Sequence, residues 1–360
     1  MSTRSRWFAA LVTAILSSSS ASSQAPRKTL RLENSAAAVV ADLGGGSIVD
    51  FHLTGGLNPL HWISPDDVKF PIRPMSHFLC LDRWGPPSDA ELKSGMPFHG
   101  EASRVEWRVS GQPGPRSAAM IAVLPLAGLE VRRVMTLDAE SPVLRVTETV
   151  TNRNKLGRMY NLVQHVTIGP PFLDETTVVD SNATRGFMQS SPLPNPEAIE
   201  IHWPEATKAG KPVDMRRLTD DPDPNVVSYI IEDDLGWVTA TNSSKQLLIG
   251  YIFRKSDYPW LNLWRHVQNG HPLARGLEFG TTGLHQPFPI LAEKPRIFGR
   301  QTYTYLDAGS SAARSYTAFQ AKIPADFAGV ASIAYANGAI TIRERGPQSR
   351  EVAIKTGPLF

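Results

Sequence analysis

The chain has 360 residues, 41% of them hydrophobic and 20% charged, with a formal net charge of +3 at pH 7. Its basic residues alternate with acidic ones, so the sequence lacks the clustered lysine and arginine of a nucleic-acid-binding surface. Proline (29 residues) and glycine (27 residues) are plentiful, which favours short elements separated by turns over long helices. The length allows one large β domain or two average domains.

Residues 1–25 follow the order of a secretory signal peptide. Arg4 and Arg6 precede an apolar run over residues 7–16, and small residues continue up to Ala25. This run is shorter than the ~20 residues that span a bilayer, so we expect no membrane segment in the mature protein. We expect export to the periplasm or the extracellular space, with cleavage between Ala21 and Ala25. The alternatives are an uncleaved anchor and a disordered tail.

Short apolar segments follow in close succession. Residues 37–43 and 47–53 flank three consecutive glycines, which predicts a hairpin. Near the other end of the chain, Asn337-Gly338 between two apolar runs is a strong hairpin signal. Alternation of apolar and polar residues is typical of strands with one buried face. We expect such strands at residues 104–109, 120–125, 129–137, 143–152, 159–168, 237–242, 246–253, 274–281, 301–307 and 311–321.

This pattern predicts an all-β protein. We expect one large antiparallel β-sandwich over residues 29–321 and a small β extension over residues 322–360. Residues 189–226 are rich in proline and aspartate, which indicates a long surface excursion of a kind that is often functional. Cys80, the sole cysteine, lies in an apolar run and is expected to be a small buried side chain.

Glu278 is the first candidate for chemistry. It lies between Leu277 and Phe279, so in a strand its side chain points to the opposite face from theirs. A buried carboxylate is costly unless it is paired, and the raised pKa that burial causes suits a general base near neutral pH. A glutamate that faces water on an edge strand is the alternative.

Two histidines are further candidates. His165 lies inside an apolar strand pattern, where a hydrogen-bonded core histidine is the alternative. His99 precedes Gly100, which permits a close backbone approach, and it is either a loop residue or a catalytic one. Together with Glu278 they would give two histidines and one carboxylate for a metal. The close spacing of metal-ligand motifs is missing, however, so we expect no metal and no cofactor.

The stretch WLNLWRH (260–266) concentrates aromatic residues. Period-2 alternation places Trp260, Asn262 and Trp264 on one face. Aromatic faces stack on the apolar side of sugar rings, so this stretch indicates a carbohydrate site. Packing of both tryptophans in the core is the alternative.

Taken in order, these stretches resemble the aldose 1-epimerase (galactose mutarotase-like) superfamily, in a divergent exported bacterial form. The resemblance spans about residues 40–320. It rests on GGSIVDFHLTGGLNPLHW (45–62), PFHGEA (97–102), QHVTIGPPFLD (164–174), YPWLNLW (258–264) and GLEFGT (276–281). It implies a sandwich that holds a sugar in a cleft on one concave face.

The resemblance also implies roles for individual residues. Glu278 would take the proton from the anomeric hydroxyl, His165 would protonate the ring oxygen so that the ring opens, and His99 would position the sugar. Reclosure then gives the other anomer, without a metal or a nucleotide. The sugar-binding residues that it implies are Asp82, Arg83, Asp174, Trp260 and Trp264.

Other functions remain open on the same fold. Gln164 stands where the superfamily has asparagine, and Ile168 stands where it has an aromatic residue. A non-catalytic sugar-binding protein of the cell envelope is therefore one alternative. A polysaccharide lyase-like enzyme, in which Arg83 and Arg265 bind uronate carboxylates, is another. In each case the expected partner is a small sugar or saccharide, and not nucleic acid or membrane.

Overall fold

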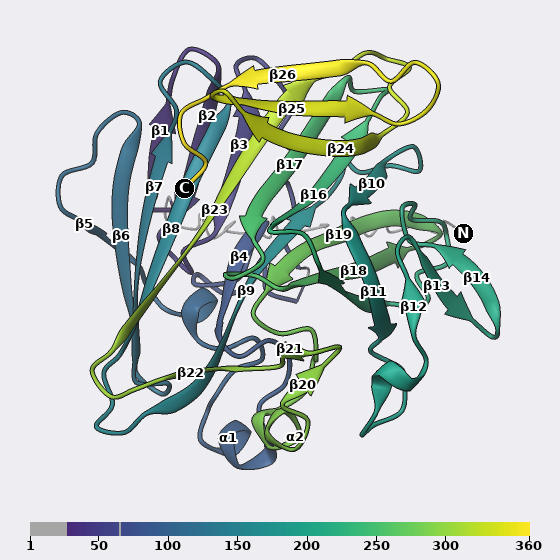
Figure 1. The fold of residues 1–360 in the computed structure, drawn as a ribbon. Coiled ribbons are helices and arrows are strands. Elements are labelled where there is room, and N and C mark those ends of the chain that lie inside the picture. Colours follow the sequence, from purple (N-terminus) through teal and green to yellow (C-terminus); the bar gives the residue numbers. More distant parts are fainter. Residues whose placement is uncertain (1–26, 65) are drawn as a thin grey trace, which may run out of the picture.

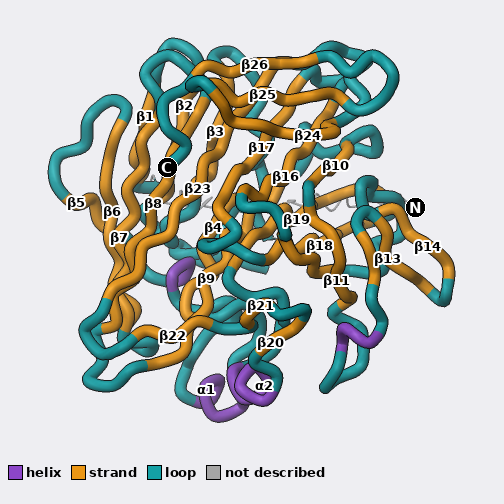
Figure 2. The backbone as a smooth tube through the Cα atoms, viewed as in Figure 1, coloured by secondary structure: helices purple, strands orange, loops and turns teal. Residues whose placement is uncertain are grey.

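The computed structural model describes residues 27–64 and 66–360, and the predicted signal peptide lies outside this part of the chain. Strands dominate it, as Figures 1 and 2 show. The two α-helices of the described residues are short, α1 (Asp89–Lys93) and α2 (Phe288–Glu293). None of the helices there is long and apolar enough to cross a membrane. The prediction of an all-β fold is confirmed.

The larger of two main sheets carries the site. Ten of its 11 strands run in the order β1-β2-β3-β4-β9-β19-β18-β15-β11-β12, and β22 pairs with β9. All the pairings are antiparallel. The strands are β1 (Thr29–Glu33), β2 (Ala37–Asp42), β3 (Ile48–Leu53), β4 (His77–Asp82), β9 (Arg158–Ile168), β11 (Ala183–Met188), β12 (Ile201–His202), β15 (Val226–Ile231), β18 (Trp260–Gln268), β19 (His271–Gly280) and β22 (Thr304–Leu306).

The smaller sheet packs against the larger one and completes the sandwich. Its eight strands run in the order β10-β16-β17-β23-β8-β7-β6-β5. They are β5 (Arg108–Ser110), β6 (Ser117–Leu124), β7 (Leu129–Leu137), β8 (Val143–Asn152), β10 (Val178–Ser181), β16 (Leu235–Asn242), β17 (Leu247–Arg254) and β23 (Ser311–Lys322).

Alternation along the central strands decides which side chains enter the sandwich. In β9, Leu162, Val166 and Ile168 enter the main core, and in β19 Leu277 and Phe279 do the same. The residues between them therefore project from the other face of the larger sheet. That outer face carries the candidate site.

Smaller sheets complete the chain (Figure 1). The hairpin of β13 (Glu205–Lys208) and β14 (Lys211–Asp214) follows β12, and β20 (Arg296–Ile297) pairs with β21 (Arg300–Gln301). The last three strands form their own sheet, whose apolar residues pack on Trp237 and Phe319 of the smaller main sheet. These strands are β24 (Val330–Ala336), β25 (Ala339–Glu344) and β26 (Glu351–Lys355).

The expected strand at residues 104–109 differs from the structure. A 3-10 turn occupies Ala102–Arg104, and β5 begins only at Arg108. The indole N–H of Trp107 donates to the carbonyl of Ala102 at 2.8 Å, inside the core. This local bond favours a turn, so the apolar-polar alternation of the segment does not extend a strand there.

Candidate functional site

One row of side chains crosses the outer face of the larger sheet. Phe78 of β4 pairs with His165 of β9, and Glu278 of β19 pairs with Asn262 of β18. The register of β19 on β9, in which Phe279 faces Gln164, places Glu278 opposite His165. Four neighbouring strands thus each contribute one side chain to the same line.

Loops close this row into a cavity of about 330 Å³. Its floor is formed by Phe78, His165, Glu278 and Trp264 of the central strands. Its walls come from the surrounding loops, the 3-10 turn and the first residue of β15. They consist of Trp62, Ser64, Asp67, Pro74, Trp84, Phe98, His99, Ser103, Arg104, Asn225, Val226 and His285. Small-molecule sites usually enclose ~300–1,000 Å³, so the cavity suits a small ligand.

Glu278 is almost fully buried, with 1% of its surface exposed. Its Oε2 accepts a hydrogen bond of 2.7 Å from the indole N–H of Trp84, and its Oε1 lies 3.3 Å from Nε2 of His165. Burial raises the pKa of Glu278 to about 8, and the Trp84 hydrogen bond opposes this rise. The carboxyl group therefore keeps its proton at neutral pH.

His165 is held in place from two sides. Its ring stacks on Phe78 with ring centroids 4.1 Å apart, and its Nδ1 lies 3.0 Å from Oγ1 of Thr167. Burial lowers the pKa of His165 to about 3, so the imidazole is neutral at physiological pH. These contacts leave Nε2 directed at Glu278.

His99 reaches the cavity from the loop before the 3-10 turn. It has a φ of 65°, and Gly100 follows with a φ of 77°. The backbone N–H of Gly85 donates to Nδ1 of His99 at 3.1 Å, so the neutral ring carries its proton on Nε2. Burial lowers the pKa of His99 well below its ordinary value. His99 thus offers a hydrogen-bond donor beside His165, whose ring centroid is 5.3 Å away.

Aromatic rings form much of the cavity surface. Trp62 and Trp264 meet edge to face with centroids 5.6 Å apart, and His285 meets Trp84 in the same way at 4.5 Å. Gly276 pairs with Trp264 across the strands, and a Cβ at Gly276 would lie 2.7 Å from Oε1 of Glu278. A glycine at this position therefore makes room for both side chains.

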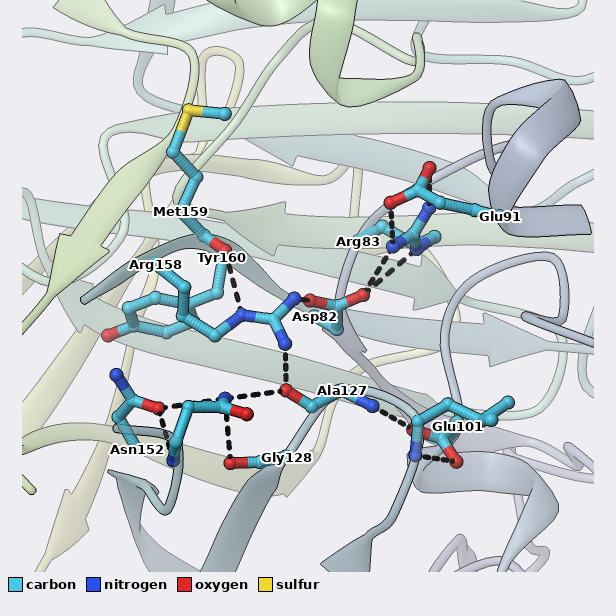
Figure 3. Close-up of polar contacts among 12 residues, drawn as sticks. Asp82, Arg83, Glu91, Glu101, Ala127, Gly128, Asn152, Arg158, Met159 and Tyr160 are labelled. Carbon is cyan, nitrogen blue, oxygen red and sulfur yellow. Dashed lines mark hydrogen bonds and ion pairs between the residues drawn. The ribbon is translucent and has the colours of Figure 1, made fainter. Parts of the chain in front are cut away.

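Asp82 and Arg83, which the sequence predicts as sugar ligands, do not line the cavity. Figure 3 shows Arg83 between Asp82 and Glu91. Its guanidinium nitrogens lie 2.6 Å from Oδ2 of Asp82 and 2.7 Å from Oε2 of Glu91, and Asp82 also pairs with Arg158. Asp82 and Arg83 are buried within this network. Their charges are satisfied by each other and anchor the chain just before Trp84, so they support the site without reaching a ligand.

Three other residues also lie apart from the cavity, contrary to expectation. Trp260 is fully buried in a separate apolar cluster and donates to the carbonyl of Gln301 at 2.9 Å. Asp174 closes a turn by accepting from the hydroxyl of Thr176 at 2.6 Å. Arg265 is buried and donates to backbone carbonyls, including that of Asp223 at 3.1 Å. Neither Arg83 nor Arg265 lines the cavity, so the two arginines on which the polysaccharide lyase alternative depends lie outside it.

The predicted residues His99, His165, Glu278 and Trp264 do come together. Within residues 27–64 and 66–360, no group of three or more histidine, cysteine, aspartate or glutamate side chains is arranged to hold a metal ion. Sequence reasoning missed the following cavity residues: Trp62, Phe78, Trp84, Phe98, Asn225 and His285. Trp84 directly follows the Asp82-Arg83 pair, and strand alternation would have placed Phe78 on the face opposite Leu79. The sequence around His285 gives no comparable signal.

Comparisons with known proteins agree with this architecture. Residues 121–288 match the model of a domain of unknown function, DUF4432, and no curated protein matches the chain. A galactose mutarotase related enzyme from Lactobacillus acidophilus superposes with a TM-score of 0.60 at 13% identity, over 82% of this chain and 98% of that one. A galactose mutarotase-like protein from Clostridium acetobutylicum gives 0.60 at 14% identity, over 82% and 96%.

A third solved structure gives the same result. A galactose mutarotase-like protein from Lactobacillus casei superposes with a TM-score of 0.59 at 15% identity, over 82% of this chain and all of that one. Each of these matches covers most of both chains. The fold is therefore the galactose mutarotase-like β-sandwich, as the sequence resemblance predicts.

Proposed function

We propose that the protein binds a sugar in the cavity at Glu278 and interconverts its anomers, as an aldose 1-epimerase-like enzyme. The observation that carries this proposal is the His165–Glu278 pair, whose facing atoms lie 3.3 Å apart in a buried, aromatic-walled cavity. Anomer interconversion needs one group that accepts a proton and one that donates a proton to a different oxygen. The pair supplies both groups.

The pair works as a unit because it holds one proton. Burial raises the pKa of Glu278 to about 8 and lowers that of His165 to about 3, so one proton stays on the pair between these values. When this proton lies on His165, Glu278 is a carboxylate base and His165 is an imidazolium acid. The short separation of Nε2 and Oε1 supports such a transfer within the cavity.

The proposed steps balance without any further reagent. Glu278 takes the proton of the anomeric hydroxyl, a C=O bond forms at the first carbon, and the bond from that carbon to the ring oxygen breaks. His165 gives its proton to the ring oxygen. Rotation about the bond between the first two carbons, reclosure and the reverse proton transfers yield the other anomer and restore the pair. His99 would donate a hydrogen bond from Nε2 to a sugar oxygen and so fix the orientation of the sugar ring.

The cavity chemistry fits a sugar ring. Trp62, Trp264 and Phe98 present apolar aromatic surface, on which the C–H face of a pyranose stacks. Histidine and carboxyl groups on the floor supply the few placed polar contacts that orient a small ligand. The volume of about 330 Å³ suits one ring.

A non-catalytic sugar-binding protein is the second candidate. The aromatic lining favours it, because Trp62 and Trp264 can stack on a sugar ring without any proton transfer. Proton exchange spectroscopy by NMR on equilibrated D-galactose and D-glucose separates the candidates. Cross-peaks between the α and β anomers that grow with protein concentration support the enzyme. Ligand line broadening without such exchange supports the binding protein.

We also propose that the protein is exported, on the basis of the order of residues 1–25. The intact mass of protein from the periplasm or medium of expressing bacteria tests this directly. Loss of 21 to 25 residues is the expected result, with the ends set by Ala21 and Ala25. A full-length chain confined to the cytoplasm would contradict export.

A further inference from the structure

A second cavity, of about 860 Å³, adjoins the first. The two share Asn225, Val226 and His285 as wall residues. Val226 pairs with Trp264 across β15 and β18, so the border between the cavities lies at the edge of the aromatic floor. The two cavities therefore meet at Asn225, Val226 and His285.

The predicted surface excursion at residues 189–226 builds most of this second cavity. Residues of its walls come from both ends of the segment and from the turn between β13 and β14. The hairpin is anchored on the sheet, because Trp203 meets Tyr229 edge to face at 5.4 Å and the Tyr229 hydroxyl donates to the carbonyl of Glu205 at 3.0 Å. Lys208 of the hairpin also pairs with Asp221 at 2.5 Å. The excursion is thus a fixed wall.

Gln189 fixes the boundary from the other side. Its side-chain amide donates to the hydroxyl of Ser228 and to the carbonyl of Gly283, both at 2.7 Å. Its side-chain oxygen accepts from the backbone N–H of His285 at 3.0 Å. One side chain therefore joins the start of the excursion, the central sheet and the loop that carries His285, and it fixes His285 where the two cavities meet.

We propose that the second cavity binds a second sugar unit, so that the preferred ligand is a reducing oligosaccharide of two or more units. This inference rests on the proposed function, since it assumes that the first cavity holds the reducing unit. The second cavity combines polar and apolar lining, as a saccharide site requires. Ser190 and Thr207 supply hydroxyl groups for hydrogen bonds, and Ile199 supplies apolar surface. Its volume, larger than that of the first cavity, leaves room for at least one more ring.

The test compares one reducing unit with the same unit extended. D-Glucose, maltose, cellobiose and lactose all present glucose at the reducing end, and calorimetry gives their dissociation constants while polarimetry gives kcat/KM. At least one disaccharide is expected to exceed glucose in affinity by about tenfold, or ~1.4 kcal/mol. Disaccharides that bind no better than glucose would overturn the inference while leaving the proposed function intact.

A substitution in the second cavity tests its location. Ser190 is exposed and lines only the second of the two cavities, so Ser190→Trp fills that space and leaves the first cavity unchanged. The disaccharide advantage is expected to disappear in this variant, with glucose turnover retained. Ser332→Trp, on an exposed position of β24, is the matched control and keeps the advantage. If Ser190→Trp still binds disaccharides more tightly than glucose, the second subsite is contradicted. If the unmodified protein does not turn over glucose at all, the proposed function itself is contradicted.

Discussion

Nε2 of His165 and Oε1 of Glu278 lie 3.3 Å apart across two neighbouring strands, and both side chains are more than nine-tenths buried. Burial disfavours the charged form of each group, so the pKa of Glu278 rises while the pKa of His165 falls. The two groups therefore titrate as a pair that holds one proton over a wide range of pH. Most of the testable consequences concern this proton.

Catalysis is expected to fall as the pH rises through about 8. The pair needs one proton to act as acid and base, and it loses this proton when the pH exceeds the pKa of Glu278, which burial raises to about 8. Between about pH 5 and pH 7, kcat/KM should be nearly constant, because His165 does not gain a second proton until about pH 3. Polarimetric rates from pH 5 to pH 10 check this. A rate that keeps rising above pH 8 would contradict it.

Trp84→Phe should move the alkaline limb of that profile to higher pH. The indole N–H donates to Oε2 of Glu278 at 2.7 Å and stabilises the carboxylate, so its removal raises the pKa of Glu278 further. The plateau rate should also fall, since the carboxylate form becomes harder to reach. Trp237→Phe, beneath the last three strands, is the control for the loss of ring volume. The idea fails if the alkaline limb of Trp84→Phe coincides with that of the unaltered protein.

Glu278→Gln should stabilise the fold increasingly as the pH rises from 4.5 to 8. In this window the folded protein retains a proton that an unfolded glutamate has released, so the native protein loses stability with rising pH. Glutamine removes this loss, which amounts to roughly a few kcal/mol at its maximum. Urea unfolding at pH 5 and pH 8.5 measures the difference. Equal stability of the two proteins at both pH values would show that the carboxyl group is not buried in a low-dielectric site.

His285 should make the fold sensitive to acid. Burial lowers its pKa to about 4, so between pH 4 and 6.5 the unfolded chain binds a proton that the folded chain does not. Stability therefore increases with pH in this window, by up to about 1.4 kcal/mol per pH unit for one such histidine. His285→Gln should flatten the dependence by about this slope, whereas His202→Gln, at an exposed position, should not. Thermal unfolding at pH 4.5, 5.5 and 6.5 measures this pH dependence of stability. The same dependence in His285→Gln and in the unaltered protein would show that His285 is accessible to water.

Local alternation in the sequence predicts on which face of its strand each of Glu278 and His165 lies. Glu278 lies between two apolar residues of β19, and His165 lies between Gln164 and Val166 of β9. Period-2 geometry fixes the face of each side chain. Alternation does not predict which distant strands pair. In the structure β19 pairs with β9, and the register of this pair brings Glu278 opposite His165. The juxtaposition itself thus comes from the sheet topology.

The other residues that line the cavity were less predictable. Arg83 and Asp82 stand beside Trp84 in sequence, yet the two charged residues turn to each other and to Glu91, while the tryptophan reaches Glu278. Whether a charged residue faces the cavity or an ion-pair partner depends on which opposite charges lie near it in the fold. The amino-acid sequence alone does not show those partners. Trp260 and Trp264 share a face, but they lie four residues apart on β18, and only Trp264 reaches the cavity.

Polarimetry on freshly dissolved α-D-galactose and α-D-glucose, with the protein and with its Glu278→Gln variant, tests the proposed role of Glu278 directly. The amide keeps the size of the side chain and can still accept from Trp84, but it cannot take a proton. We expect the protein to accelerate the decay of optical rotation, and the variant to reduce this acceleration by at least ~100-fold while its affinity for the sugar changes by no more than a few-fold. Glu293→Gln, at an exposed position of α2, should behave like the unaltered protein. Full acceleration by Glu278→Gln would contradict the role assigned to the pair.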